Sequence, residues 1–354
     1  MRHLIRRTVL FVLVISALSS MQLMAGYLAR SSAGVLAREP QLRPAGLGDG
    51  ALPGLQFADP AEQLVVMEPP EPSHRGGAQL QHPLLIPPGR LGFQPELTLT
   101  YDSAGGSGWV GTGWDLSVGE VSVDTRWGVP RYDQLKESET YLLDGDVLSP
   151  TAVREELQDR VTDRSDFSRR TETEYELIIR HGNSPQTYWW EVRDKMGGVR
   201  WYGGYPDAGG PQVGRAATTY PSLKQDPSAI LFDDQGNAYR WALTAKRDVG
   251  TNMIRYLYDK VAGKRVGAEK ATLGQQLYLR RILYTAAAED SNQSENPAYE
   301  IRFLRDEHVT PTPDPRKDVI VDARGGFLEV TSDLLRRVEI WTRRSRSEIG
   351  RAHV

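Results

Sequence analysis

Histidine and serine side chains carry much of the acid–base and nucleophilic chemistry of enzymes. Four histidines lie between the two ends of the chain, at His74, His82, His181 and His308. They are scattered, and the sequence has no His-Glu-x-x-His metal motif, no Gly-x-Ser-x-Gly motif and no phosphate-binding loop. Ser107 stands among glycines without the flanks of a nucleophile. We therefore expect no catalytic residue, no cofactor-binding residue and no metal ligand.

Two aspartates in the segment 140–148 have the oxygen donors that calcium prefers. Asp144 and Asp146 flank a glycine in the sequence Thr-Tyr-Leu-Leu-Asp-Gly-Asp-Val-Leu. A calcium loop needs further oxygen ligands at alternate positions, and this segment lacks them. Two apolar runs around an Asp-Gly pair are typical of a tight hairpin, so we expect a turn and no metal site.

Aromatic side chains offer a different possibility, because indole rings stack on sugars. Carboxylates are also plentiful, and a glycosidase needs a pair of them. The alternative function is therefore that of a surface protein that binds or cleaves carbohydrate. Exposed, coplanar rings beside two carboxylates would favour it, whereas buried rings would favour a structural role. The rings concerned are Trp109, Trp114, Trp189, Trp190 and Trp201.

Composition narrows the classes of protein. The net charge of −3 over 354 residues gives no reason to expect a nucleic-acid partner. The chain has no cysteine, which excludes thiolate metal sites, a cysteine nucleophile and disulfides. Packing alone must stabilise the fold.

The elements that would position these residues are strands. Between 76 and 131, short runs alternate apolar and polar residues and are separated by loops rich in glycine and proline. Leu97, Leu99 and Tyr101 fall on one face of the clearest strand, which predicts that this face is buried. Trp114 follows Gly113, so we expect its ring to cover bare backbone at a tight corner.

The same segment resembles a known family. Its order is Pro-Pro-Gly-Arg, then Gly-Phe-x-Pro-Glu-Leu-x-Leu-x-Tyr-Asp-Ser, a glycine-rich loop, Gly-Thr-Gly-Trp and Gly-Val-Pro-Arg-Tyr-Asp. This order resembles the N-terminal domain of SpvB-type proteins, named for the Salmonella virulence plasmid B protein, which also opens the B components of Tc insecticidal toxin complexes. Members usually have leucine where this chain has Thr112. The resemblance runs from about Gly76 to Trp341.

Some proteins of this family carry an ADP-ribosyltransferase domain, and those enzymes have a Glu-x-Glu pair. Glu172 and Glu174 have this spacing. The other interpretation is an ordinary strand with the glutamates in solvent and a buried face formed by Thr173, Tyr175, Leu177 and Ile179. No Ser-Thr-Ser segment accompanies the pair, so we expect the strand and no enzymatic activity.

Three later segments resemble one another. Each begins with an aspartate and has glycine or asparagine before an aromatic strand, at 194–198, 233–237 and 248–252. The last resembles the family's Asp-x-x-Gly-Asn-x-Ile-x-Tyr-x-Tyr unit, with Thr251 inserted between glycine and asparagine. Together with strands expected near 277–285, 299–304 and 334–340, they predict an all-β fold, a winding sheet of many hairpins that forms part of a Tc/Rhs-like shell.

The two ends differ from this body. Arginines followed by the apolar run 8–18 predict a signal peptide over 1–25, with a retained anchor as the alternative. Residues 26–75 are rich in proline and glycine and predict a linker or arm, and the β domain is expected over 76–345. Residues 349–354 match the translation of a common sequencing adapter. We therefore expect a truncated chain whose last residues pack against nothing.

The resemblance implies a non-catalytic component of a secreted toxin, part of the shell or scaffold around a toxic payload. It implies secretion, with family members acting in the host cytoplasm, and no cofactor. The expected partners are other toxin-complex subunits or downstream shell domains, with no nucleic acid and no membrane span after signal cleavage.

Overall fold

The computed structural model describes residues 71–72, 76–151, 159–160, 163–171, 175–205, 224–264, 274–285, 297–311, 313, 316–345 and 348–351. The predicted signal peptide, most of the predicted arm, and Glu172 and Glu174 lie outside these residues. The described part contains strands and three short 3-10 turns, so the all-β prediction is confirmed. In that part, no helix is long and apolar enough to cross a membrane.

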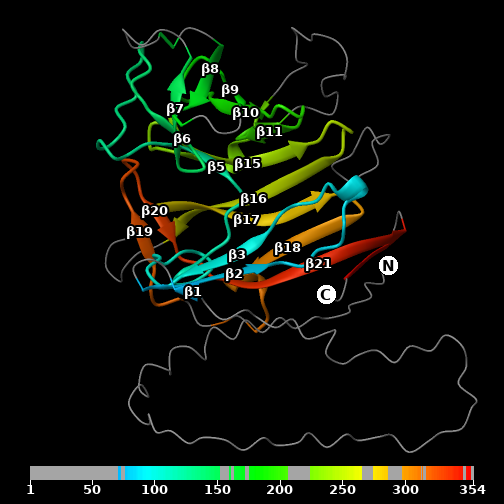
Figure 1. The fold of residues 1–354 in the computed structure, drawn as a ribbon. Coiled ribbons are helices and arrows are strands. Elements are labelled where there is room, and N and C mark those ends of the chain that lie inside the picture. Colours follow the sequence, from blue (N-terminus) through cyan, green and yellow to red (C-terminus); the bar gives the residue numbers. More distant parts are fainter. Residues whose placement is uncertain are drawn as a thin grey trace, which may run out of the picture. The chain divides into compact units, whose positions relative to one another are not determined.

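Eight strands close into a barrel, which contains the green strands of Figure 1 and the longer β15. Each strand pairs antiparallel with the next one in the order given below. The last strand, β15, also pairs with the first, β5, and this pairing closes the ring. The strands are β5 (Glu120–Val123), β6 (Tyr141–Leu143), β7 (Asp146–Pro150), β8 (Arg164–Arg169), β9 (Leu177–His181), β10 (Trp189–Arg193), β11 (Val199–Tyr202) and β15 (Ala238–Arg247).

Strand β15 closes the barrel because it is ten residues long and has different partners along its length. Its residues 240–242 pair with β5, and its residues 243–247 pair with β11. Its last three residues, 245–247, also pair with β16 (Met253–Lys264). One strand therefore belongs both to the barrel and to the open sheet that follows it.

The open sheet continues from β16 through long antiparallel strands (Figure 1). These are β17 (Gly274–Tyr284), β18 (Tyr299–Arg305) and β21 (Leu335–Ser345), followed by the short β22 (Glu348–Arg351). The expected strands near 277–285, 299–304 and 334–340 are therefore present. The expectation that the last residues pack against nothing is wrong for 349–351, because they pair with β21, Ile349 opposite Arg343.

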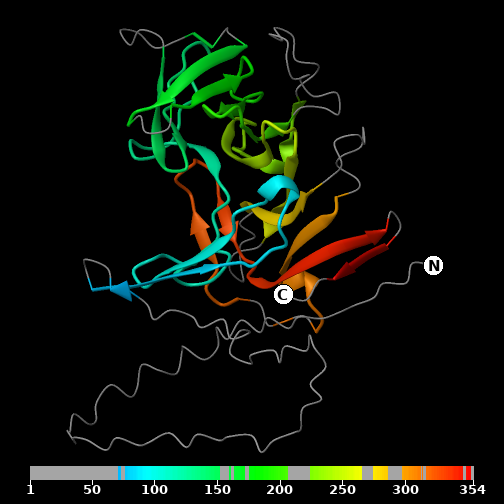
Figure 2. The same cartoon turned by 45° about the vertical axis from the view of Figure 1, so that its right-hand side comes forward.

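A four-stranded sheet packs on the long strands: β1 (Glu71–Pro72), β2 (Ala78–Pro83), β3 (Thr98–Asp102) and β4 (Trp114–Asp115). Leu97 and Leu99 are buried, as the alternation predicted, and they share one hydrophobic core with Ile301 and Phe303 of β18. Figure 2 shows β2 and β3 in blue and cyan, viewed from a second direction.

The remaining elements are short. Strand β14 (Ile230–Phe232) pairs with β15, and β20 (Glu329–Thr331) joins β19 (Ile320–Asp322) to β17. Strands β12 (Gly204–Tyr205) and β13 (Lys224–Gln225) form a separate pair. The 3-10 turns are η2 (Arg90–Gly92), η3 (Pro227–Ala229) and η4 (Asp306–His308).

The three similar aspartate segments form the same turn. Each joins two antiparallel strands, and in each the first aspartate donates its backbone N–H to the residue four positions later. The third position after the aspartate is left-handed, at Gly197 (φ 87°), Gly236 (φ 85°) and Thr251 (φ 64°). Thr251 is therefore not a mere insertion, because it occupies the position that glycine holds in the other two turns.

One predicted face is only partly right, because Ile179 is fully buried as expected but two other members of that face are exposed. Tyr175 is 74% exposed and Leu177 is 39% exposed, whereas Ile178 and Arg180 are fully buried. Strand β9 begins at Leu177, and its residues 178 and 180 point into the barrel. The alternation misled because a buried arginine does not look like a core residue in the sequence.

Candidate functional site

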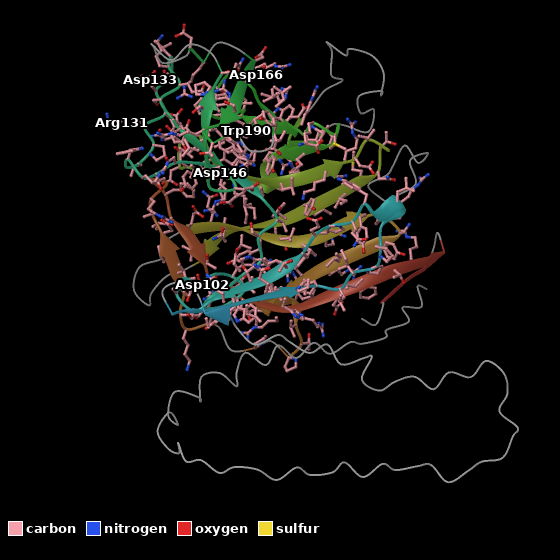
Figure 3. The ribbon with its side chains drawn as sticks, viewed as in Figure 1. Asp102, Arg131, Asp133, Asp146, Asp166 and Trp190 are labelled. Atoms are coloured by element: carbon pink, nitrogen blue, oxygen red, sulfur yellow. The ribbon has the colours of Figure 1, made fainter. Side chains whose placement is uncertain are left out.

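The barrel interior is filled by aromatic side chains. Trp190 is completely buried, and its ring centroid lies 4.8 Å from that of Tyr141, 5.2 Å from Phe167 and 5.9 Å from Trp241. Figure 3 labels Trp190 among the barrel strands. Trp241 donates its indole N–H to the Tyr188 carbonyl at 2.6 Å. These tryptophans stabilise the barrel and offer no face to a ligand.

Two buried arginines line the loop between β5 and β6. Arg180 donates to the Glu137 carboxylate and, at 2.9 Å, to the Ser165 hydroxyl. Arg160 donates to Glu139 at 2.5 Å and to the Tyr188 hydroxyl at 3.3 Å. Burial raises the pKa of Tyr188, so its hydroxyl stays neutral between the two guanidinium groups. The loop therefore contributes two carboxylates that neutralise two interior cations.

The other sequence-predicted tryptophans are also packed. Trp189 and Trp201 belong to a second buried cluster with Val199 and Ala245. Trp109 and Trp114 are half-buried and pack against the main core. The ring of Trp114 lies 5.2 Å from that of Tyr101, with which it pairs across β3 and β4. The five rings thus form no exposed row of the kind that sugar binding requires.

The aspartates considered for calcium have other partners. The segment 140–148 is the predicted hairpin, with Asp144 (φ 53°) and Gly145 (φ 89°) in its turn. The Asp144 carboxylate accepts the Glu120 backbone N–H at 2.8 Å, and Asp146 accepts from Arg169 at 2.5 Å. Ser107, the other candidate, lies 2.9 Å from the Thr112 hydroxyl in an exposed loop.

A cavity of about 350 Å³ is lined by residues of β2, β3 and β4. The glycine-rich loop supplies bare backbone, and the polar lining comes from Gln79, Gln81, Thr100, Tyr101, Asp102 and Asp115. Asp102 already accepts the backbone N–H of Ala104 at 2.8 Å. The cavity has polar groups but no nucleophile paired with a base.

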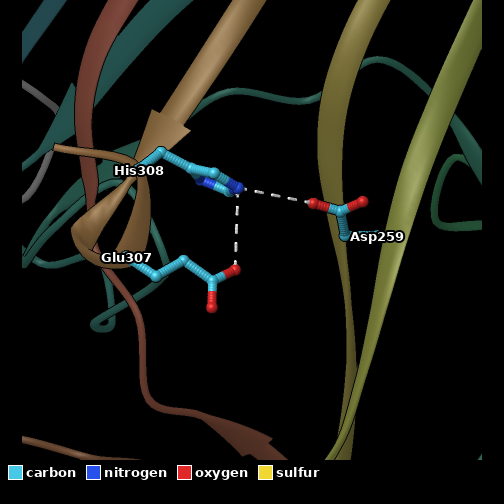
Figure 4. Close-up of side chains that lie close together, drawn as sticks. All are labelled: Asp259, Glu307 and His308. Carbon is cyan, nitrogen blue, oxygen red and sulfur yellow. Dashed lines mark ion pairs between the residues drawn. The ribbon is translucent and has the colours of Figure 1, made fainter.

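One cluster has the residue types of a metal site. Asp259, Glu307 and His308 each place one ligand atom within 4.8 Å of the others (Figure 4). The His308 Nε2 atom lies 3.9 Å from an Asp259 oxygen and 3.7 Å from a Glu307 oxygen. Sequence reasoning missed this cluster because Asp259 lies on β16, far along the chain from η4.

Arg305 already serves as the cation of this cluster. Its guanidinium donates to Asp259 at 3.0 Å, to Glu307 at 2.6 Å and to Asp333, and it lies 4.5 Å above the Tyr278 ring. A metal ion would have to sit beside this guanidinium, which repels it. The arrangement is therefore complete as an ion-pair network that joins β16, β18 and the residues before β21.

The tautomer of His308 also opposes a metal ion. Its Nδ1 atom accepts the Arg305 backbone N–H at 3.3 Å, so the proton of the neutral ring sits on Nε2. Because Nδ1 is engaged, a metal ion could bind only Nε2, where the proton occupies the lone pair that the ion would need. Burial, and then the nearby Arg305 charge, lower the pKa of His308, which keeps the ring neutral near pH 7.

His181 is structural. The His181 ring stacks 3.9 Å from the Trp189 ring at 5° and lies 3.2 Å from a Glu191 oxygen. Glu191 is buried and is also paired with Arg193. No signal in the sequence separated these buried charged residues from surface ones, because the contact between His181 and Glu191 joins two strands, β9 and β10.

Comparisons with known proteins agree with this fold. The N-terminal domain of effector protein SpvB from Salmonella typhimurium strain LT2 is 22% identical, with a TM-score of 0.56, and the similarity covers 71% of this chain and 84% of that one. The TcdB2-TccC3-Cdc42 structure has the same identity and TM-score and covers 75% of this chain. A Photorhabdus luminescens Tc holotoxin pore is 21% identical, with a TM-score of 0.55 and 79% of this chain covered.

The chain spans only 13% of the length of the two Tc toxin chains. At these identities the likeness shows the fold alone. No curated protein matches the chain. A family model described as "Salmonella virulence plasmid 65kDa B protein" matches residues 72–317. The match covers more than half of the chain, in the region where the motifs predicted it, and the chain therefore belongs to the SpvB family.

Proposed function

We propose that this chain is a non-catalytic component of a secreted toxin complex and forms part of the shell or scaffold around a toxic payload. The observation that carries the proposal is the packing of the tryptophans, because Trp190, Trp201 and Trp241 are at most 1% exposed. Buried rings of this kind stabilise a rigid β structure, as the proposed shell role requires. Because these three rings are buried, none of them can stack on a sugar. Membership of the SpvB family and the likeness to Tc toxin structures support the same role.

The proposal includes partners and location. The partners are other subunits or further shell domains of a toxin complex, since the similar Tc chains are much longer than this one. The chain would be exported through its N-terminal segment. No catalytic, cofactor or metal residue is proposed, because each candidate that the structure describes is engaged in packing, a turn or an ion pair.

Assembly is the direct test. The purified full chain is mixed with the TcdB2-TccC3 protein from which the region matched by this chain has been removed, and the mixture is separated by size-exclusion chromatography. We expect a complex that contains both proteins. Intact TcdB2-TccC3 is the control and should not retain the chain, because its own region occupies the place. Absence of a complex would contradict the assignment.

Enzymatic activity is tested separately. The purified chain should release no nicotinamide from NAD. Activity that the double change Glu172→Gln and Glu174→Gln abolished would show that the chain is an ADP-ribosyltransferase-like enzyme. The carbohydrate alternative is tested by retention on polysaccharide columns, with Trp114→Ala as the probe of ring stacking.

A further inference from the structure

We propose that Trp127 and Arg131 form a docking anchor for a partner protein, which would offer an apolar slot bordered by carboxylates. The inference rests on the proposed function, because the partner is the remaining part of the toxin shell. It assigns to the described surface a site that neither the fold nor the family match implies.

Trp127 is the most exposed large apolar residue in the described part of the chain. Its exposed fraction is 90%, and Val129 beside it is 57% exposed. A tryptophan side chain buries about 150–250 Å² when it is covered. Tryptophan is also enriched among the few residues that carry most of the binding energy of an interface. The other tryptophans of this chain for which burial is described are packed, which makes Trp127 the exception.

Hydrogen bonds within residues 124–128 order the turn that carries Trp127. The Asp124 carboxylate, whose side chain is 1% exposed, accepts the Arg126 backbone N–H at 3.0 Å and its guanidinium at 2.7 Å. The hydrogen bonds from Arg126 lower the pKa of Asp124, so the carboxylate stays charged. Gly128 (φ 115°) closes the turn by donating its N–H to the Thr125 carbonyl at 3.1 Å.

The residues that follow the turn, 129–132, also contact the rest of the protein. A Cβ atom added at Gly326 would lie 2.8 Å from Val129, so this glycine leaves room for the loop to rest on the 323–326 turn. Tyr132 donates its hydroxyl to the Ala238 carbonyl of β15 at 3.3 Å. A side chain on a preordered turn loses little conformational entropy on binding, which raises affinity.

Charge indicates the kind of partner. The charges of Asp124 and Arg126 neutralise each other, and the Asp133 carboxylate accepts the backbone N–H groups of Leu135 and Lys136. Arg131 is exposed and has no ion pair with any described residue, and Figure 3 shows it at the outer edge of the molecule. Arg131 therefore offers an unpaired positive charge four positions from an apolar ring, which a carboxylate at the border of the partner's slot would complement, while the Asp133 carboxylate keeps its own negative charge.

The spacing suits a single interface. Arg131 is four positions after Trp127, so their Cα atoms are at most about 14 Å apart. A standard interface buries about 800 Å² on each partner, a patch about 30 Å across. Both side chains therefore fit within one contact, with Trp127 near its centre and Arg131 closer to its rim.

The test measures affinity of full-chain variants for TcdB2-TccC3 lacking the region that this chain matches. Trp127→Ala should weaken binding by about 30-fold or more, because the ring is a central anchor. Leu91→Ala is the matched control, since Leu91 is 88% exposed on the distant turn η2, and it should bind like the wild type. Arg131→Glu should weaken binding mainly by slowing association, because Arg131 lies near the rim, whereas Arg131→Lys should retain most of the affinity.

Thermal melting of each variant shows that it is folded, and the exposed positions should melt within about 1 °C of the wild type, as surface substitutions do. If the wild type binds and Trp127→Ala binds equally well, the docking anchor is wrong while the proposed function stands. If the wild type does not bind, the proposed function fails, and the anchor, which depends on it, fails too. Equal losses for Trp127→Ala and Leu91→Ala would also overturn the anchor.

Discussion

The guanidinium carbon of Arg180 lies 3.9 Å from the centroid of the Tyr188 ring inside the barrel. Arg180 is completely buried, and its charge is balanced by Glu137 from the loop between β5 and β6. A buried arginine that loses its carboxylate is an uncompensated charge in a medium of low polarity. The loop, and not only the strands, is therefore required for the barrel to be stable.

Glu137→Ala should destabilise the chain by about 3–5 kcal/mol, the cost of breaking a buried ion pair. The free energy of unfolding is measured by urea denaturation. The double variant Glu137→Leu with Arg180→Met removes both charges and should lose less stability than Glu137→Ala. A single variant as stable as the wild type would show that water reaches Arg180.

Trp190→Ala should cost about 3–5 kcal/mol, because it leaves a cavity among Tyr141, Phe167 and Trp241. Trp127→Ala is the matched control, since it removes the same side chain from a position that is 90% exposed. It should change the free energy of unfolding by less than about 0.5 kcal/mol. Similar losses in the two variants would contradict the placement of both rings.

Thr251→Gly should stabilise the chain by about 0.5–1 kcal/mol. Thr251 has a φ of 64°, a backbone region that is strained for a β-branched residue, and glycine would remove this strain. Glycine also raises the entropy of the unfolded chain, which offsets part of the gain in stability. Gly236→Ala is the converse change, at a position with φ 85° and no close neighbour, and it should destabilise. Denaturation midpoints of the two variants moving in the same direction would refute the common turn.

His308 should make stability depend on pH. Its folded pKa lies below its unfolded value, so the unfolded chain binds more protons in the range between the two. Its contribution is therefore present above the ordinary histidine pKa near 6.5 and is lost as the pH falls below it. His308→Gln should reduce the loss of stability between pH 7.5 and 5, measured by urea denaturation. An unchanged pH profile would show that His308 is not involved.

Zinc should not stabilise the chain, because Arg305 occupies the position between Asp259 and Glu307. Melting curves with and without ~100 μM ZnCl₂ should therefore coincide, whereas a bound ion would raise the midpoint by mass action. A zinc-dependent increase that His308→Gln removed would establish a metal site.

The sequence predicted those strands and turns that depend on neighbouring residues. Alternation and the Asp-Gly and aspartate-initiated turns identified the strands on either side of Asp144, Asp194 and Asp248, because a hairpin is specified by residues adjacent in the chain. The buried face of Leu97 and Leu99 followed for the same reason. For Leu177 the pattern selected the wrong face, because the inward neighbour is an arginine.

The sequence by itself determined an all-β fold, the hairpins and the family, since each depends on short-range spacing and turn chemistry. Only the tertiary structure decided that β15 closes a barrel, that Trp190 faces inward and Trp127 outward, and that Arg305 fills the Asp259 cluster. Those features depend on residues far apart in the chain, as in the pair formed by Arg180 and Glu137, 43 positions away. An alternating pattern shows that a strand has a buried face, but it does not show which distant strand or charge covers that face.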